Sequence, residues 1–377
     1  MNVSRSALIR AAIGIAISVV AIFILIRSVD IGEAMQVLAT ASPAWIAVML
    51  VTTTIDIGAR GARWRALLVP IAPLRYRRVL GYTYIGYLAN NVLPARLGEL
   101  YRSHALGEGE GVSRPTVLGT VVVERVVDTV MVVAIASLAV LVLSVRGVMQ
   151  SAVLLGLAFV ALIVIALGIG IAAHRLPGAA RVTAIIARRP RLLEVARRLQ
   201  EGLKVAGKPR PVALALFFSA IAWAASTMTF LAAGQAIGLQ LTVAQGALLT
   251  SGVALVTIVP SGPGFVGTFE LTVVAIADQL GIPRDAAFAL GLLVHVMILG
   301  TTTIGGVIAL ATLRRRDKAV REGDGATATT GATTATGATG GTSAAAAGAA
   351  IASNAASAGN AATAPERLGE PGGEPTR

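Results

Sequence analysis

The sequence predicts an all-α polytopic membrane protein, with about six spanning helices and two re-entrant helical hairpins in an inverted-topology repeat. Of its 377 residues 55% are hydrophobic and only 14% are charged, whereas roughly a quarter of the residues in soluble domains are charged. Several apolar runs are long enough to cross the hydrocarbon core as helices. Basic loops then restrict how many times the chain crosses between those runs.

Six segments have the length and composition of spanning helices. The first resembles a signal peptide, but no small-x-small cleavage site follows it before Arg27, so we expect an uncleaved helix. The second is short, at the lower limit for a span. The six segments are 7–26, 43–59, 116–143, 151–173, 211–237 and 285–312.

Basic residues concentrate in four places and predict the orientation. They occur before the first span, in the loop that begins at Arg60 and ends at Arg78, in the segment 174–210, and at Arg314 to Arg316. Loops of this kind face the cytoplasm, so we expect both termini there. The bias toward Ala, Gly, Val and Arg is typical of a GC-rich bacterial genome, which indicates the bacterial cell (inner) membrane.

The segments 79–115 and 238–284 must each cross the membrane an even number of times. Both ends of the first are expected in the cytoplasm, and both ends of the second outside. A helix over 79–93 reaches about 22 Å before Pro94 stops it, and the arms 243–259 and 268–280 reach about 25 and 20 Å. None of them spans comfortably. We therefore predict two re-entrant hairpins, over 79–106 and 243–280, that enter from opposite faces, as in transporters built from inverted repeats.

Two accessory parts complete the predicted organisation of a membrane domain over 1–316. The basic cytoplasmic loop 174–210 contains an amphipathic helix over 190–207, which either lies on anionic inner-leaflet lipids or is a solvated connector. The tail 317–377 is rich in Ala, Gly and Thr, and we expect it to be disordered.

The stretch NNVLPARLGELYR follows the first hairpin arm and is unusually polar. Pro94 leaves the carbonyl of Asn90 without its helical donor, so a polar pocket forms at a broken helix, and a new helix can begin near Ala95. Its arginines can pair with the glutamate or hold a phosphate. The alternative is that they only neutralise it at the membrane boundary. The candidate residues are Asn90, Asn91, Pro94, Arg96, Glu99 and Arg102.

The third span carries a second polar group in VVVERVVDTV. Glu124, Arg125 and Asp128 lie within roughly 100° of one another on a helix. Two acids and one base leave one negative charge over, which indicates that Arg96 or Arg102 completes the set. Either a polar pathway or an internally paired salt bridge fits this pattern. Buried charges cost roughly 2.5–3.5 kcal/mol each on insertion scales, so they need partners or a task.

The second hairpin contains TIVPSGPGFVGTFE. Pro260 breaks the helix, while Gly264 and Gly267 allow positive φ and close backbone approach. Glu270 follows in the first turn of the next helix, as expected for a coupling-ion, proton or head-group amine site. The glycines equally suit tight packing. His295 is too isolated in the sequence to assign.

Composition and motifs argue against several classes of function. The formal charge of +13 fits basic membrane loops and anionic lipid better than nucleic acid. There is no cysteine, and the three histidines are scattered, so we expect no metal site and no cofactor. The glycine-rich stretches lack the Lys-Ser/Thr and the preceding strand of a nucleotide loop.

The three motifs together resemble the lysylphosphatidylglycerol synthase transmembrane (flippase-like) family over roughly residues 7–315. The resemblance implies an integral protein that moves an aminoacylated or glycosylated phospholipid or a polyprenyl-linked lipid between leaflets. It departs from the full-length synthases, which carry a soluble aminoacyl-transfer domain. The family pattern falls on Asn91, Pro94, Arg96, Gly98, Glu99, Arg102, Glu124, Arg125, Asp128, Pro260, Gly264, Gly267 and Glu270.

The leading hypothesis is therefore a lipid transporter without ATP drive, in which Arg96 and Arg102 engage an anionic head group. One alternative is a membrane transferase with Glu99 or Glu124 as the base, although no nucleophile or metal constellation supports an enzyme. The other is a non-catalytic partner of a separate synthase or glycosyltransferase that docks on 174–210.

Overall fold

The computed structural model describes residues 5–93, 97–144, 190–257 and 261–336, together with eight positions between 151 and 165. All elements in these ranges are helical, as the sequence predicts. The chain divides into one unit over Met1–Asp317 and a second over Lys318–Arg377. The first unit holds the membrane helices and the polar clusters.

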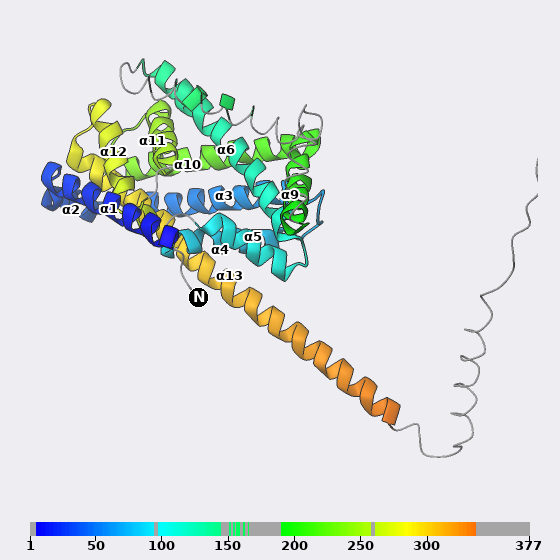
Figure 1. The fold of residues 1–377 in the computed structure, drawn as a ribbon. Coiled ribbons are helices and arrows are strands. Elements are labelled where there is room, and N and C mark those ends of the chain that lie inside the picture. Colours follow the sequence, from blue (N-terminus) through cyan, green and yellow to red (C-terminus); the bar gives the residue numbers. More distant parts are fainter. Residues whose placement is uncertain are drawn as a thin grey trace, which may run out of the picture. The chain divides into compact units, whose positions relative to one another are not determined.

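Figure 1 shows the order of the helices. They are α1 (Arg5–Ser28), α2 (Ile31–Ala39), α3 (Pro43–Leu68), α4 (Tyr76–Val92), α5 (Gly98–Gly109), α6 (Arg114–Val142), α9 (Pro190–Leu203), η3 (Lys204–Gly207), α10 (Pro209–Ala236), α11 (Val243–Val256), η4 (Pro263–Phe265), α12 (Thr268–Gln279) and α13 (Arg284–Thr336). Proline occupies the first turn of α3, α6 and α10, where its missing N–H costs no helical hydrogen bond. Thr242 and Gln245 form a capping box that starts α11.

Three helices in the described part of the chain are long and apolar enough to cross a membrane. They are α6, α10 and the Arg284–Leu313 portion of α13, and a fourth span exists if the bent pair Ala12–Ser28 and Ile31–Ala39, with its 86° angle, counts as one. The predicted span 151–173 lies largely outside the described residues. A multi-pass membrane protein is thus supported, while the count of six spans stays a prediction.

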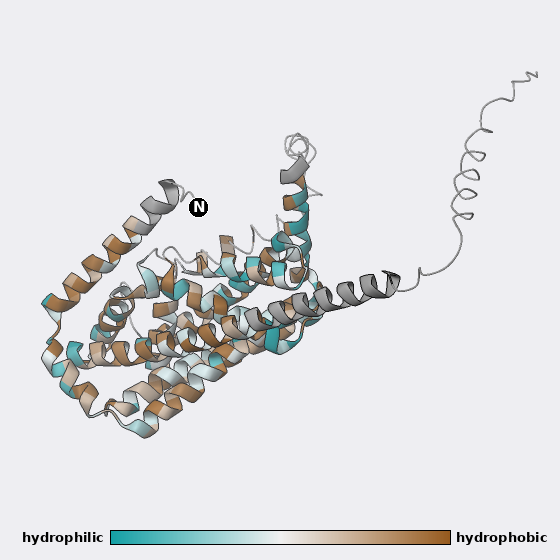
Figure 2. Ribbon diagram, turned by 90° about the horizontal axis from the view of Figure 1, so that it is seen from below, coloured by the Kyte–Doolittle hydropathy of each residue, from teal (hydrophilic) through white to brown (hydrophobic). Residues whose placement is uncertain are grey.

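The outward faces of these helices are apolar, as a lipid environment requires. Figure 2 shows hydrophobic residues along most of α1, where Phe23 leaves 58% of its surface exposed. On α6 and α13, Leu141 and Ile304 are 75% and 63% exposed. Exposed aliphatic surface of this extent favours lipid over water as the surrounding medium.

The helix predicted over 43–59 is longer than expected, because α3 continues to Leu68; where the second span ends within it stays a prediction. The helix lies beside α10 and antiparallel to it (Figure 1). The backbone N–H of Ser42 donates to the carbonyl of Ala236 at 2.8 Å, and the hydroxyls of Thr52 and Thr229 are 2.8 Å apart. Residues at the start of α3 therefore meet residues at the end of α10.

Two helical hairpins occur where the sequence places them. In the first, the N–H of Gly98 donates to Oδ1 of Asn90 at 2.8 Å, and so α4 caps the start of α5. A Cβ at Gly98 would lie 2.1 Å from the carbonyl oxygen of Gly86, which explains the glycine. The helix begins at Gly98 and not near Ala95 as predicted, because Asn90 supplies the cap there. Whether the hairpins are re-entrant stays a prediction.

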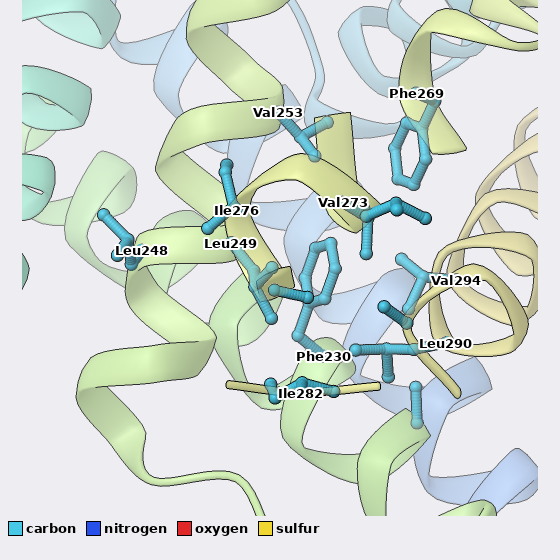
Figure 3. Packing of buried hydrophobic residues seen from close by; sticks show 14 of the residues in the cluster. Phe230, Leu248, Leu249, Val253, Phe269, Val273, Ile276, Ile282, Leu290 and Val294 are labelled. Carbon is cyan, nitrogen blue, oxygen red and sulfur yellow. The ribbon is translucent and has the colours of Figure 1, made fainter. Parts of the chain in front are cut away.

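The second hairpin packs its arms on each other and on α10 and α13. Figure 3 shows the resulting hydrophobic cluster, with side chains from α10, α11, α12 and α13 directed toward one another. A second cluster joins α3, α4, α5 and α6 around Trp64. The two hydrophobic clusters pack the hairpins against the long helices, and residues of the first cluster also line the polar site.

The accessory parts follow the predictions in part. The helix α9 packs on α6, where a Cβ at Gly202 would lie 2.1 Å from the carbonyl oxygen of Thr116. Its predicted contact with anionic lipid stays a prediction. The helix α13 continues to Thr336, past the predicted start of the tail at residue 317, and residues 337–377 lie outside the described residues.

Candidate functional site: a charged cavity between two hairpins

A cavity of about 290 Å³ lies between the tips of the two hairpins. The first hairpin contributes Asn90 and Asn91 to its wall, and the second contributes Gly264 and Phe265. Its charged and titratable lining residues come from five helices and are Asp56, Arg60, Tyr87, Glu99, Arg125, Asp128 and His295. A larger groove of about 880 Å³ lies on the opposite face of α3, but its lining is mainly apolar.

Arg63 is the structural centre of the buried charges. Its side chain is fully buried, and it donates to Oδ1 of Asp128 at 2.6 Å and to Oε1 of Glu124 at 2.7 Å. It also donates to the hydroxyl of Ser219 at 3.1 Å. The sequence analysis placed Arg63 in a loop, whereas it lies inside the helix α3; its cytoplasmic side stays a prediction. Two carboxylates on α6 compensate the charge, which lets α3 stay helical past residue 59.

Arg102 completes the pairing of Glu124. It donates to Oε2 at 2.8 Å, and its guanidinium lies 4.3 Å from the ring centroid of Trp64. Both oxygens of Glu124 therefore already accept hydrogen bonds from arginine. The predicted pair between Arg102 and Glu99 is replaced by this contact, and Arg102 is not among the residues that line the cavity.

Asp128 connects the buried charges to the cavity. The indole N–H of Trp223 donates to its Oδ1 at 3.0 Å, and Nη1 of Arg60 lies 3.6 Å from its Oδ2. Arg60 in turn donates to Oδ1 of Asp56 at 2.7 Å, one helical turn away. These contacts fix Asp128 while leaving Arg60 and Asp56 on the cavity wall.

We call this set the charged cluster. It contains four arginines and four carboxylates among the described residues, so it is electrically balanced. Its members are Asp56, Arg60, Arg63, Glu99, Arg102, Glu124, Arg125 and Asp128.

Arg125 is the most loosely held arginine of the charged cluster. Its guanidinium lies 3.6 Å from Glu124, 3.6 Å from Asp128 and 3.9 Å from Glu99, which is longer than ordinary hydrogen bonds. Its side chain is 45% exposed, whereas that of Arg63 is completely buried. Arg125 can therefore turn its N–H donors toward an anion in the cavity.

His295 lines the cavity beside the second hairpin, and its ring is paired with Glu270, which lies behind the cavity wall. Nδ1 of His295 is 2.6 Å from Oε1 of Glu270, and Nε2 is 2.7 Å from the carbonyl oxygen of Gly264. Oε2 of Glu270 accepts the N–H of Gly267 at 2.8 Å. Both glycines have positive φ, 65° and 85°, as the sequence analysis expected. The tip of the second hairpin, from Gly264 to Gly267, is thus bound to α13 through His295.

The remaining predicted residues divide into two groups. Asn91 donates from Nδ2 to the hydroxyls of Thr302 and Thr303, at 2.9 and 3.0 Å, and so ties the first hairpin to α13. Pro94, Arg96 and Pro260 lie outside the described residues. No group of three potential metal ligands occurs in the described ranges.

The spacing of four residues predicts a structural contact between Asp56 and Arg60, and the structure has it at 2.7 Å. Sequence reasoning missed Arg63 and His295. Arg63 has a signal, because it lies three positions after Arg60 on the same face of a helix that continues past residue 59. His295 has none, because its partner Glu270 lies 25 positions away on another helix.

Comparison with known proteins agrees with this membrane architecture. The family model for the lysylphosphatidylglycerol synthase transmembrane region matches residues 11–306. A relative from Haloferax volcanii, the glycosyltransferase AglD, is 28% identical over 138 residues, which are 36% of this chain and 22% of that protein. The aligned part therefore covers less than a quarter of the relative's length.

Proposed function

The chain belongs to the lysylphosphatidylglycerol synthase transmembrane family, and on this basis we propose that it moves a lipid with a charged head group between membrane leaflets. The head group would be that of an anionic, aminoacylated or glycosylated phospholipid or of a polyprenyl-linked lipid. The acyl or prenyl chains stay in the surrounding lipid, since a cavity of about 290 Å³ holds a head group and no more.

The single observation that carries this proposal is a hollow lined by charges inside a bundle with apolar outer faces. Each buried charge costs roughly 2.5–3.5 kcal/mol on insertion scales. Ion pairing alone would fit a purely structural role, as it does for Arg63, which is buried away from the cavity wall. Asp56, Arg60, Glu99 and Arg125 instead line a cavity, where an incoming head group can reach them.

The donor set suits a head group that carries both signs of charge. A phosphate would bind Arg125, which replaces Arg102 in the role that the sequence analysis gave it. An ammonium group would bind Glu99 or Asp56 on the same wall. The described part of the site also lessens the case for a transferase, because both oxygens of Glu124 are occupied by arginine.

The repeat-like layout supports access from both leaflets. The helices α3 and α10 run antiparallel, and each precedes a hairpin whose tip reaches the same cavity. In transporters with inverted repeats, such halves rock against each other around a fixed site. Our proposal includes two re-entrant hairpins, cytoplasmic termini and a bacterial inner membrane.

The test uses purified protein in liposomes that contain fluorescent anionic, lysyl- or glyco-lipids. We expect faster exchange between leaflets for at least one charged class, and little effect on a lipid with a neutral, uncharged head group. Protein-free liposomes and an unrelated helical membrane protein serve as controls. Exchange at the control rate for every lipid class would contradict the proposal.

A second candidate function follows from the likeness to glycosyltransferase AglD. In it, the chain is the membrane partner of a separate synthase or glycosyltransferase and presents a polyprenyl-linked sugar, with 174–210 as the docking segment. Exchange restricted to polyprenyl-linked sugars in the same liposomes would favour this candidate over aminoacylated phospholipid.

A further inference from the structure

The hydrogen bonds of His295 require a proton between its ring and Glu270. The carbonyl oxygen of Gly264, 2.7 Å from Nε2, only accepts, so Nε2 carries a hydrogen. Nδ1 then faces Oε1 of Glu270 at 2.6 Å. A nitrogen lone pair and a carboxylate oxygen repel at that distance. One further proton therefore lies between the two atoms, on either residue.

Among the described residues, this proton is the only charge compensation for Glu270, because the N–H of Gly267 that donates to its Oε2 is neutral. Both side chains are about 95% buried, and Phe269 stacks on the imidazole with centroids 4.4 Å apart. No arginine or lysine in the described ranges forms an ion pair with Glu270, in contrast to Glu124 and Asp128, which bind Arg63. Without the proton, the Glu270–His295 pair has a net charge of −1 in a buried site.

Other ionisable groups face the pair across the cavity. They come from α3, α4, α5 and α6 and line the cavity wall described above. These groups are Asp56, Arg60, Tyr87, Glu99, Arg125 and Asp128. The charged cluster members among them are three carboxylates and two arginines, and the charge balance of the whole cluster is completed by Arg63, Arg102 and Glu124, which do not line the cavity. The wall therefore has no surplus positive charge and does not replace the missing cation beside Glu270.

Both residues of the pair bind the backbone of the hairpin tip. His295 on α13 binds the carbonyl of Gly264, and Glu270 binds the N–H of Gly267. Loss of the proton converts the bond between Nδ1 and Oε1 into a repulsion and weakens the link between α13 and the tip. Gly264 and Phe265 line the cavity, so the same link controls one of its walls.

We propose that the Glu270–His295 pair is a proton-binding site that couples proton movement to opening of the cavity. The pair takes one proton from water on one side of the membrane and releases it to water on the other. The protonated pair holds the tip closed, and the deprotonated pair releases it. Coupling to lipid rests on the proposed function, whereas the proton-dependent tip does not.

The first experiment measures opening of the tip without any lipid assay. The chain has no cysteine, so a single Ser261→Cys reports on a buried tip position, 5% exposed. Its rate of thiol labelling is divided by that of exposed Val266→Cys, which removes the pH dependence of the thiol itself. We expect this labelling ratio to rise roughly fivefold or more when the pH is raised from about 5 to about 9.

Glu270→Gln is the decisive variant, because its amide donates to Nδ1 whatever the pH. It should keep the labelling ratio low and independent of pH. Asp278→Asn is the matched control: it lies on the same helix, is exposed and pairs only with Arg284 among the described residues, and it should leave the pH response intact. A ratio independent of pH in the parent protein, or a pH response that survives in Glu270→Gln, would overturn the proton site.

A second experiment separates the two proposals. Liposomes with a trapped pH indicator and a fluorescent lipid are given a pH gradient. We expect the gradient to accelerate lipid exchange and the protein to carry protons, and Glu270→Gln to lose both responses. Lipid exchange that neither responds to the pH gradient nor moves protons would contradict the coupling of protons to lipid, and it would leave the proposed lipid function standing. Absence of exchange would defeat the lipid function, and the labelling ratio would still decide the proton site.

Discussion

Replacing Arg63 by alanine should lower the free energy of unfolding by about 3–5 kcal/mol, the usual range when one partner of a buried ion pair is removed. Arg63 is completely buried and holds Asp128 and Glu124 at 2.6 and 2.7 Å. Without Arg63, the carboxylates of Glu124 and Asp128 on α6 each lose their shortest ion pair inside the bundle. Unfolding in mixed detergent and dodecyl sulfate micelles measures the change.

Two variants make this expectation specific. Arg65→Ala removes an exposed arginine two positions along the same helix and should cost less than about 0.5 kcal/mol. Adding Asp128→Asn to Arg63→Met restores the charge balance and should recover a measurable part of the loss. An equal, small effect of Arg63→Ala and Arg65→Ala would show that the buried pairs do not stabilise the bundle.

Replacing Arg125 by alanine should reduce lipid exchange about tenfold or more while the protein stays folded. Its ion pairs are 3.6–3.9 Å long, and its side chain is 45% exposed. Its buried partners Glu124 and Asp128 keep their shorter bonds to Arg63, so its removal leaves neither of them unpaired. A charge-assisted hydrogen bond to phosphate contributes about 1.5–3 kcal/mol, which corresponds to roughly a tenfold to hundredfold change in rate. The initial rate of exchange of an anionic lipid in liposomes measures it.

Arg125→Lys distinguishes a phosphate contact from simple charge. Lysine keeps the charge but loses the bidentate geometry, so part of the activity should remain. Unfolding in detergent checks that each variant is folded. If Arg125→Ala exchanges lipid at the parental rate, the phosphate does not bind at this arginine.

The sequence alone predicts much of the fold, because apolar runs and breakers act locally. Pro94 and the glycines around Gly264 mark the two hairpin tips, and the structure has a helix on each side of both. The end of α3 was misjudged because arginine in an apolar segment normally marks a boundary. Here Arg63 is buried inside the helix bundle because two carboxylates on α6 pair with it. These partners are 61 and 65 positions away in the sequence, so local patterns do not show the pairing.

The site was harder to predict for the same reason. Glu124, Arg125 and Asp128 were identifiable from spacing within one helix. The partners that give them their different roles lie on other helices. Arg102 is spaced to meet Glu99 on its own helix, but it stacks on Trp64 and binds Glu124. The surplus negative charge on α6 predicted that Arg96 or Arg102 would bind there, without saying which of the two or at the expense of which pair. Such choices depend on tertiary packing, which the spacing of residues in one helix does not contain.

The central claim is that the lipid head group passes through the cavity between the hairpins. Ser226 lies on the cavity wall and is half-buried, and Ala224 is exposed on the same helix. In a chain without cysteine, Ser226→Cys can be modified with a benzyl methanethiosulfonate, which fills the cavity, and Ala224→Cys serves as the control. We predict that modification of Ser226→Cys stops lipid exchange and that a reductant restores it, with no effect at Ala224→Cys. Unchanged exchange by fully modified Ser226→Cys would contradict the account.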